Sequence, residues 1–178
     1  MSLHYCKCSD YSGPELVALL DDVRKCISYD PETGIFTRAK ASTHRHVGQV
    51  CTVRRPDGYL QVATGRGNIL AHRLAFMLGH GRAPVGEIDH INRDKADNRL
   101  SNLREATKAQ NGANKIPSRR SISGLKGASW CNRARKWRAA IRVATRQVHL
   151  GFFATAEEAH AAYVEAARKY HGEFARAA

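Results

Sequence analysis

The segment from Lys136 to Val143 most constrains the fold of this chain, because its side chains alternate between two chemistries. Alternate positions are apolar and the others mostly basic, namely Trp137, Ala139, Ile141 and Val143 against Lys136, Arg138, Ala140 and Arg142. A period of two is typical of a strand with one buried and one exposed face. Gln147–Phe152 alternates in the same way and predicts a neighbouring strand whose buried side carries Val148, Leu150 and Phe152. We therefore expect a sheet with one apolar and one basic face.

A helix is predicted to cover the apolar face of this sheet. Thr155-Ala156-Glu157-Glu158 has the spacing of a capping box, and small apolar residues follow at helical spacing as far as His171. A further strand is expected near Gly127–Trp130. The C-terminal part therefore predicts a small three-stranded antiparallel sheet packed on one helix.

The charge of the chain is strongly asymmetric. The net charge is +13, and the segment 115–156 contains ten Lys or Arg and no Asp or Glu. Residues 1–114 carry sixteen basic and twelve acidic side chains. A block of uncompensated positive charge repels itself unless a polyanion neutralises it, so we expect double-stranded DNA as the partner. The alternative partner, a membrane surface, is disfavoured because the block does not form an amphipathic helix.

A second pattern upstream carries the residue types needed for hydrolysis of a phosphodiester. Asp89 and His90 are adjacent, Asn102 follows twelve residues after the histidine, and Asn111 nine residues later. Asp89 and Asn111 offer oxygen ligands suited to a hard divalent cation, with magnesium expected and manganese the alternative. His90 can then act as general base near neutral pH.

The local pattern places these residues on a strand–loop–strand–helix unit. We expect strands at 87–90 and 102–106, joined by a polar loop in which Asn92 and Asn98 are interpreted as ordinary loop residues. Thr107 and Gln110 have capping-box spacing, which puts Asn111 in the first turn of a helix.

This arrangement resembles the HNH nuclease family and its ββα-metal motif. The resemblance rests on Asp89-His90, on Asn102 within Ser-Asn-Leu, on Asn111 within Ala-Gln-Asn, and on the preceding stretch 71–76. It implies that His90 activates water, that Asp89 and Asn111 hold the metal, and that Asn102 braces the loop that orients His90. Some relatives carry another histidine where this chain has Lys115, which can contact phosphate but does not bind metal.

Residues 123–174 resemble the DNA-binding domain of the plant apetala-two/ethylene-response-factor family. The matching stretches are 125–130, 137–141, 149–153 and 155–159. With the charge pattern, this likeness predicts that the basic sheet face grips DNA, through Lys115, Lys126, Arg133, Arg135, Lys136, Arg138, Arg142, Gln147 and His149. Replacements at Ser129, Gln147 and His149 mean that no target sequence can be transferred from the plant domains.

The remaining N-terminal segments predict small elements. Pro14 begins a helix that reaches about Lys25, and short strands are expected at 35–37, 48–53 and 59–63. Residues 71–78 predict a buried helix in which His72 is interpreted as a packing or hydrogen-bonding residue. The five cysteines are expected to be free thiols.

We therefore predict an α+β chain with a nuclease domain at 1–114, a basic linker at 115–124 and a DNA-binding domain at 125–178. The predicted function is a metal-dependent, site-directed DNA endonuclease of homing or phage type. We expect a cytoplasmic monomer, encoded by a phage or mobile element, that needs no small-molecule cofactor and does not bind a membrane. The alternative is a non-catalytic DNA-binding regulator that retains a degenerate HNH fold.

Overall fold

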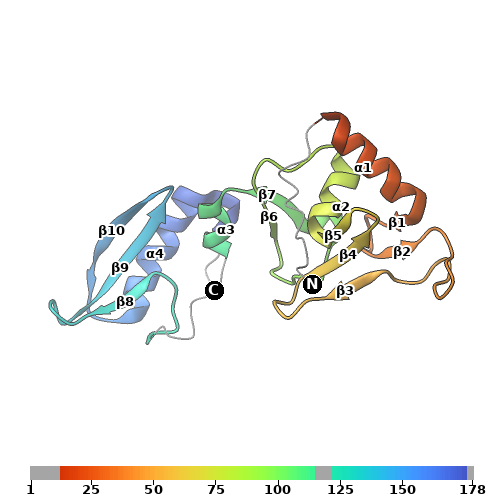
Figure 1. Ribbon diagram of the computed structural model, residues 1–178. Coiled ribbons are helices and arrows are strands. Elements are labelled where there is room, and N and C mark those ends of the chain that lie inside the picture. Colours follow the sequence, from red (N-terminus) through yellow and green to blue (C-terminus); the bar gives the residue numbers. More distant parts are fainter. Residues whose placement is uncertain (1–12, 115–121, 176–178) are drawn as a thin grey trace. The chain divides into compact units, whose positions relative to one another are not determined.

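The computed structural model has the expected α+β architecture and describes residues 13–114 and 122–175 (Figure 1). The chain divides into two compact units, Met1–Glu105 and Ala106–Ala178. This division falls before the boundary predicted at residue 114, so the short helix carrying Asn111 is grouped with the second unit.

The first unit combines two helices with small antiparallel sheets. Its elements in chain order are α1 (Gly13–Cys26), β1 (Ile27–Tyr29), β2 (Phe36–Arg38), β3 (Thr52–Arg54), β4 (Leu60–Thr64), β5 (Gly67–Leu70), α2 (Ala71–His80), β6 (Glu87–His90), the 3-10 helix η2 (Leu100–Asn102) and β7 (Leu103–Ala106). Strands β1 and β2 form a hairpin, β3–β4–β5 a three-stranded sheet, and β6 pairs with β7.

The core of the first unit lies between the helices and these strands. Its fully buried side chains include Leu19 of α1, Phe36 of β2, Val62 of β4, and Leu74 and Met77 of α2. Both predicted helices are confirmed, as are the strands at 87–90 and after Asn102. Strands β1 and β5 were not predicted, and β3 begins at Thr52 rather than near residue 48.

The second unit is a three-stranded antiparallel sheet with a helix on one face. It contains α3 (Lys108–Asn114), β8 (Ala128–Cys131), β9 (Lys136–Val143), β10 (Arg146–Phe153), α4 (Ala156–His171) and the 3-10 helix η3 (Gly172–Phe174), with strand order β10-β9-β8. Figure 1 shows α4 lying along this sheet. Ala139 and Ile141 pack against α4 residues that include Ala159 and Tyr163, which confirms the predicted phase of β9.

The predicted buried face of β10 is confirmed for Val148 and Leu150, which pack on the core, and is wrong for Phe152. The register with β9 shifts between His149 and Gly151, so one extra residue enters β10. A bulge of this kind reverses the faces of the residues that follow it. Phe152 therefore pairs with Arg138 of the outer face and is 46% exposed, while Phe153 packs on the apolar side.

The sequence predicted free cysteine thiols and no membrane-spanning segment. Among the described residues, Cys26, Cys51 and Cys131 are free thiols, and Cys6 and Cys8 lie outside the described part. No helix within residues 13–114 or 122–175 is both long and apolar enough to cross a membrane.

Candidate active site

Asp89 and His90 lie together at the end of β6, where the chain leaves the strand for the polar loop. The backbone N–H of Ile91 donates to the carbonyl of Asn102 at 2.9 Å, which ties the start of the loop to η2. Both residues are only 5% exposed. A buried acid and imidazole at the mouth of a loop are unusual for purely structural residues, because burial of titratable groups needs specific partners.

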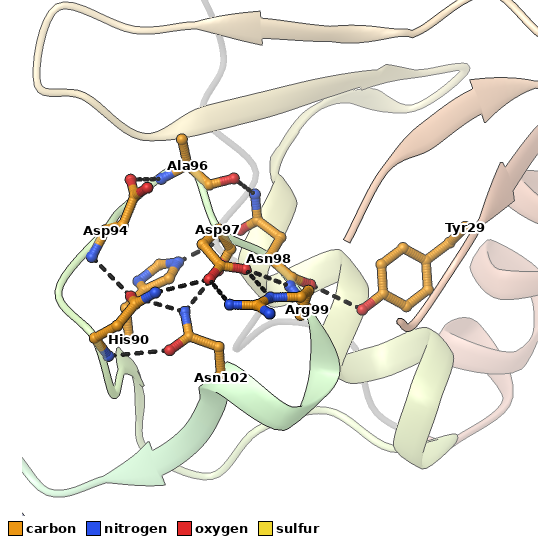
Figure 2. A network of polar contacts seen from close by, with 9 residues as sticks. Tyr29, His90, Asp94, Ala96, Asp97, Asn98, Arg99 and Asn102 are labelled. Atoms are coloured by element: carbon orange, nitrogen blue, oxygen red, sulfur yellow. Dashed lines mark hydrogen bonds and ion pairs between the residues drawn. The ribbon is translucent and has the colours of Figure 1, made fainter. Parts of the chain in front are cut away.

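Asn98 is a partner of His90, and the sequence did not indicate this role. The Nε2 atom of His90 lies 3.4 Å from Oδ1 of Asn98. The amide nitrogen of Asn98 donates to the carbonyl of Ala96 at 3.0 Å, so its oxygen is the atom that faces the imidazole (Figure 2). This favours the tautomer in which Nε2 carries the proton and Nδ1 carries the lone pair.

The environment of His90 keeps its imidazole neutral. Burial lowers the pKa of His90 below its ordinary value. The hydrogen bond to the Asn98 side-chain oxygen and the nearby carboxylates, Asp89 first among them, act in the opposite direction. Desolvation disfavours the charged form of a histidine. A neutral imidazole near pH 7 is the form that can accept a proton.

Asn98 is itself held by the N-terminal hairpin. Its side chain is 1% exposed, and its backbone carbonyl accepts a hydrogen bond from the Tyr29 hydroxyl at 2.9 Å. The next part of the loop is tied to the same hairpin, because the N–H of Leu100 donates to the carbonyl of Pro31 at 3.0 Å. The interpretation of Asn98 as an ordinary loop residue was therefore wrong, because Asn98 is buried and tied to distant segments. Only these long-range contacts reveal its position.

Asn102 has the geometry expected of a residue that braces the loop. Its Oδ1 accepts from the N–H of Asn92 at 3.0 Å, and its amide nitrogen donates to Oδ1 of Asn92 at 3.0 Å and to the carbonyl of Asp97 at 2.8 Å (Figure 2). These bonds link both ends of the loop to one buried side chain. Asn92 takes part as well, although the sequence suggested only a loop residue.

Asp89 is paired with a guanidinium that the sequence did not identify. Oδ2 of Asp89 accepts from Nε of Arg104 at 3.1 Å and from its Nη2 at 3.0 Å. The two side chains are 6% and 15% exposed, so water screens this pair little. Arg104 lies on β7, which pairs with β6, and it compensates the buried charge of the carboxylate.

Asn111 lies in α3, in the second unit, and is half-buried. The predicted capping box at the start of this helix is present, because Gln110 N–H donates to Thr107 Oγ1 at 3.3 Å and Thr107 N–H to Gln110 Oε1 at 2.8 Å. No group of three or more His, Cys, Asp or Glu side chains in the described residues could hold a metal ion. The metal-ligand assignments of Asp89 and Asn111 stay predictions.

Most of the predicted DNA-binding residues lie on the outer face or at one end of the β8–β9–β10 sheet. In the register, Arg142 pairs with Gln147, His149 with Ala140, and Lys136 with Cys131. Lys136, Arg142, Gln147 and His149 are exposed, and Arg138 is half-buried on the same face. Arg133 and Arg135 are exposed in the β8–β9 turn, Lys126 is half-buried before β8, and Lys115 lies outside the described residues.

Residues 70–113 match the family model of the HNH endonucleases. Protein 3.8 of Escherichia phage T7 is 32% identical to this chain over 106 residues, which is 59% of this chain and 87% of the phage protein. The chain belongs to the HNH endonuclease family. Its HNH match includes Asp89, His90, Asn102 and Asn111. Neither match identifies residues 125–178 as an apetala-two domain, so that likeness stays a prediction. No solved structure matches the chain significantly.

Proposed function

We propose that this HNH protein is a metal-dependent DNA endonuclease that hydrolyses phosphodiester bonds with His90 as general base. The observation that carries the proposal is the buried contact between His90 Nε2 and Asn98 Oδ1, inside the segment that matches the HNH family. This contact holds the ring and favours one tautomer, as a general base requires.

The chemistry of the base follows from that tautomer. Nδ1 of His90 takes a proton from water while the water oxygen attacks the phosphorus, and the bond to the leaving oxygen breaks. The leaving oxygen then takes a proton from solvent, and His90 returns its proton to solvent. Asn98 and Asn102 act on this step by holding the ring and the loop, because misplacement by about 1 Å can cost 100-fold in rate.

The donor set fits a hard divalent cation, and we propose magnesium. Asp89 and Asn111 would hold it through a carboxylate and an amide oxygen, the ligand types that such ions prefer. When bound, the cation would neutralise charge that develops on the phosphate. The Arg104 guanidinium already compensates Asp89, so cation binding at this carboxylate would compete with an ion pair that the structure contains.

We further propose that the outer face of the β8–β9–β10 sheet holds duplex DNA and directs cleavage to a site. Support comes from the basic residues of β9, which face away from α4, and from the absence of Asp and Glu between residues 115 and 156. Two-stranded ribbons and sheets of this kind can enter the major groove. A homing or phage role is consistent with the relative from phage T7.

A nicking assay on supercoiled plasmid tests the proposal. The full chain should convert the plasmid to open-circular or linear DNA with magnesium, and a chelator should stop the reaction. His90→Ala should lower the rate by about 10²–10⁴-fold with DNA affinity within a few fold of the unmodified chain. His80→Ala, an exposed histidine at the end of α2, is the control. Tight DNA binding without any cleavage would favour the alternative, a non-catalytic regulator.

A further inference from the structure

A second histidine, His72, lies against the proposed base. It is the second residue of α2 and is only 5% exposed. Its ring centroid is 5.1 Å from that of His90, in an edge-to-face arrangement with an interplanar angle of 74°. Tyr59, just before β4, contacts both rings, at 5.1 Å from His72 and 6.0 Å from His90. Helix α2, strand β6 and the turn before β4 thus bring three rings together at the base.

The Nδ1 atom of His72 is buried and has no hydrogen-bond partner among the described residues. A buried polar atom without a partner costs stability, and native proteins tolerate one mainly where a water, an ion or a function accounts for it. Packing alone does not explain why position 72 carries a histidine. The neighbouring buried positions of α2, among them Ala71, Leu74 and Ala75, are apolar. A phenylalanine would fill the space without the cost.

The imidazole of His72 is neutral over the whole physiological range. Burial lowers the pKa of His72 to about 3, and the nearby His90 and Arg73 act in the same direction. The first turn of α2 contains no acidic residue, so the positive end of the helix is not compensated there. His72 therefore does not compete with His90 for a proton, and its nitrogens remain available for hydrogen bonding.

We propose that His72 is a positioning residue for His90. Its ring holds the base edge to face, and its buried Nδ1 binds an ordered water that keeps the imidazole of His90 oriented. The inference rests on the proposed function, because it assigns His72 to the same hydrolytic site. It goes beyond that function by giving the α2 histidine a role that the Asp89-His90 pair does not require.

Two substitutions in the full chain separate a positioning role from packing. His72→Phe keeps a ring of similar size but removes both nitrogens, and His72→Asn keeps a polar group close to the position of Nδ1. His80→Phe makes the same chemical change on an exposed histidine of α2 and is the matched control. The readouts are the thermal unfolding midpoint, DNA affinity, and the single-turnover cleavage rate with magnesium.

We expect His72→Phe to unfold at the same or a higher temperature and to bind DNA as tightly as the unmodified chain. Its cleavage rate should fall on the order of 10- to 100-fold, as misplacement of a reacting group does. His72→Asn should recover part of that rate although it packs less well. His80→Phe should leave the cleavage rate unchanged.

The inference is overturned if His72→Phe cleaves at the unmodified rate, or if its rate falls only in proportion to lost folded protein. If His72→Phe does not fold, His72→Asn is compared with a Leu74→Ala variant of equal stability. A lower cleavage rate for His72→Asn supports the inference, and an equal rate overturns it. A failure of the proposed function looks different, since the unmodified chain would then show no magnesium-dependent cleavage at all.

Discussion

At the scale of single residues, the site depends on how buried charges are compensated. Asp89 is almost fully buried, and Arg104 provides two of its hydrogen bonds. A buried ion pair adds little stability over apolar packing, but removal of one partner leaves an uncompensated charge. The proposed metal ligand is therefore a residue whose charge the fold already balances.

Arg104→Met should destabilise the protein by about 3–5 kcal/mol, because Asp89 would remain buried without its partner. Magnesium should restore more stability to this variant than it adds to the unmodified chain, since the cation no longer competes with a guanidinium. Chemical denaturation with and without magnesium measures both effects. Arg66→Met, which removes an exposed pair with Asp22 at 2.7 Å, is the control and should change stability little. An equal magnesium effect in all three proteins would exclude Asp89 from metal binding.

At the scale of elements, the β1–β2 hairpin supports the loop that holds His90. Gly34 ends the hairpin turn with φ of 73°, and a Cβ atom there would meet the backbone of Asn98 and Arg99. The Tyr29 hydroxyl and the Pro31 carbonyl bind the same stretch. A part of the chain outside the HNH match therefore positions the proposed base.

Gly34→Ala should reduce both stability and cleavage, because the added methyl group pushes the hairpin away from Asn98. Gly48→Ala is the matched control, since Gly48 has φ of 80° and open space around its Cβ position. The control should show only the backbone strain of a left-handed residue, of order 1–3 kcal/mol. Cleavage rates normalised to folded protein compare the two. Equal rates in both variants would show that the hairpin does not position the base.

The sheet of the second unit is the element proposed to grip DNA. Arg142→Ala should reduce the slope of log affinity against log salt by about 0.9, because one phosphate contact is lost. Lys169→Ala, an exposed cation near the end of α4, should leave the slope unchanged. Binding titrations at several salt concentrations measure these slopes. The same loss in both variants would mean that net charge, rather than the sheet face, attracts DNA.

At the scale of the whole molecule, the HNH match spans two compact units. It begins at Leu70 and ends at Ala113, whereas the division into units falls between Glu105 and Ala106. The two predicted metal ligands therefore belong to different units.

Asp89→Ala and Asn111→Ala should both raise the magnesium concentration needed for cleavage, and excess magnesium should rescue Asn111→Ala more fully. Asp89 contributes a negative charge, whereas the neutral Asn111 mainly fixes geometry. Metal titrations of the cleavage rate measure the difference. Lys108→Ala, at the exposed start of α3, controls for damage to that helix. Metal dependence that is unchanged in both variants would remove these residues from the metal site.

The elements of the fold could largely be predicted from the sequence, because their signals are local. Alternation in Lys136–Val143 predicted β9 and its buried face, and the capping boxes at Thr107 and Thr155 predicted where α3 and α4 begin. Periodicity and capping depend on residues within a few positions of each other. The roles assigned to Asp89, His90 and Asn111 rest on residue type, spacing and family resemblance, and they stay predictions.

Contacts between distant segments decided the rest. The hydroxyl of Tyr29 reaches Asn98 across 69 positions, and the ring of His72 contacts His90 although α2 and β6 are separate elements. The bulge after His149 turned Phe152 outward against the alternation of its own strand. The sequence by itself determined the local elements and which side chains are candidates for the site. Only the tertiary structure decided which side chains hold those groups, because burial and hydrogen-bond partners arise when segments far apart in the chain pack together.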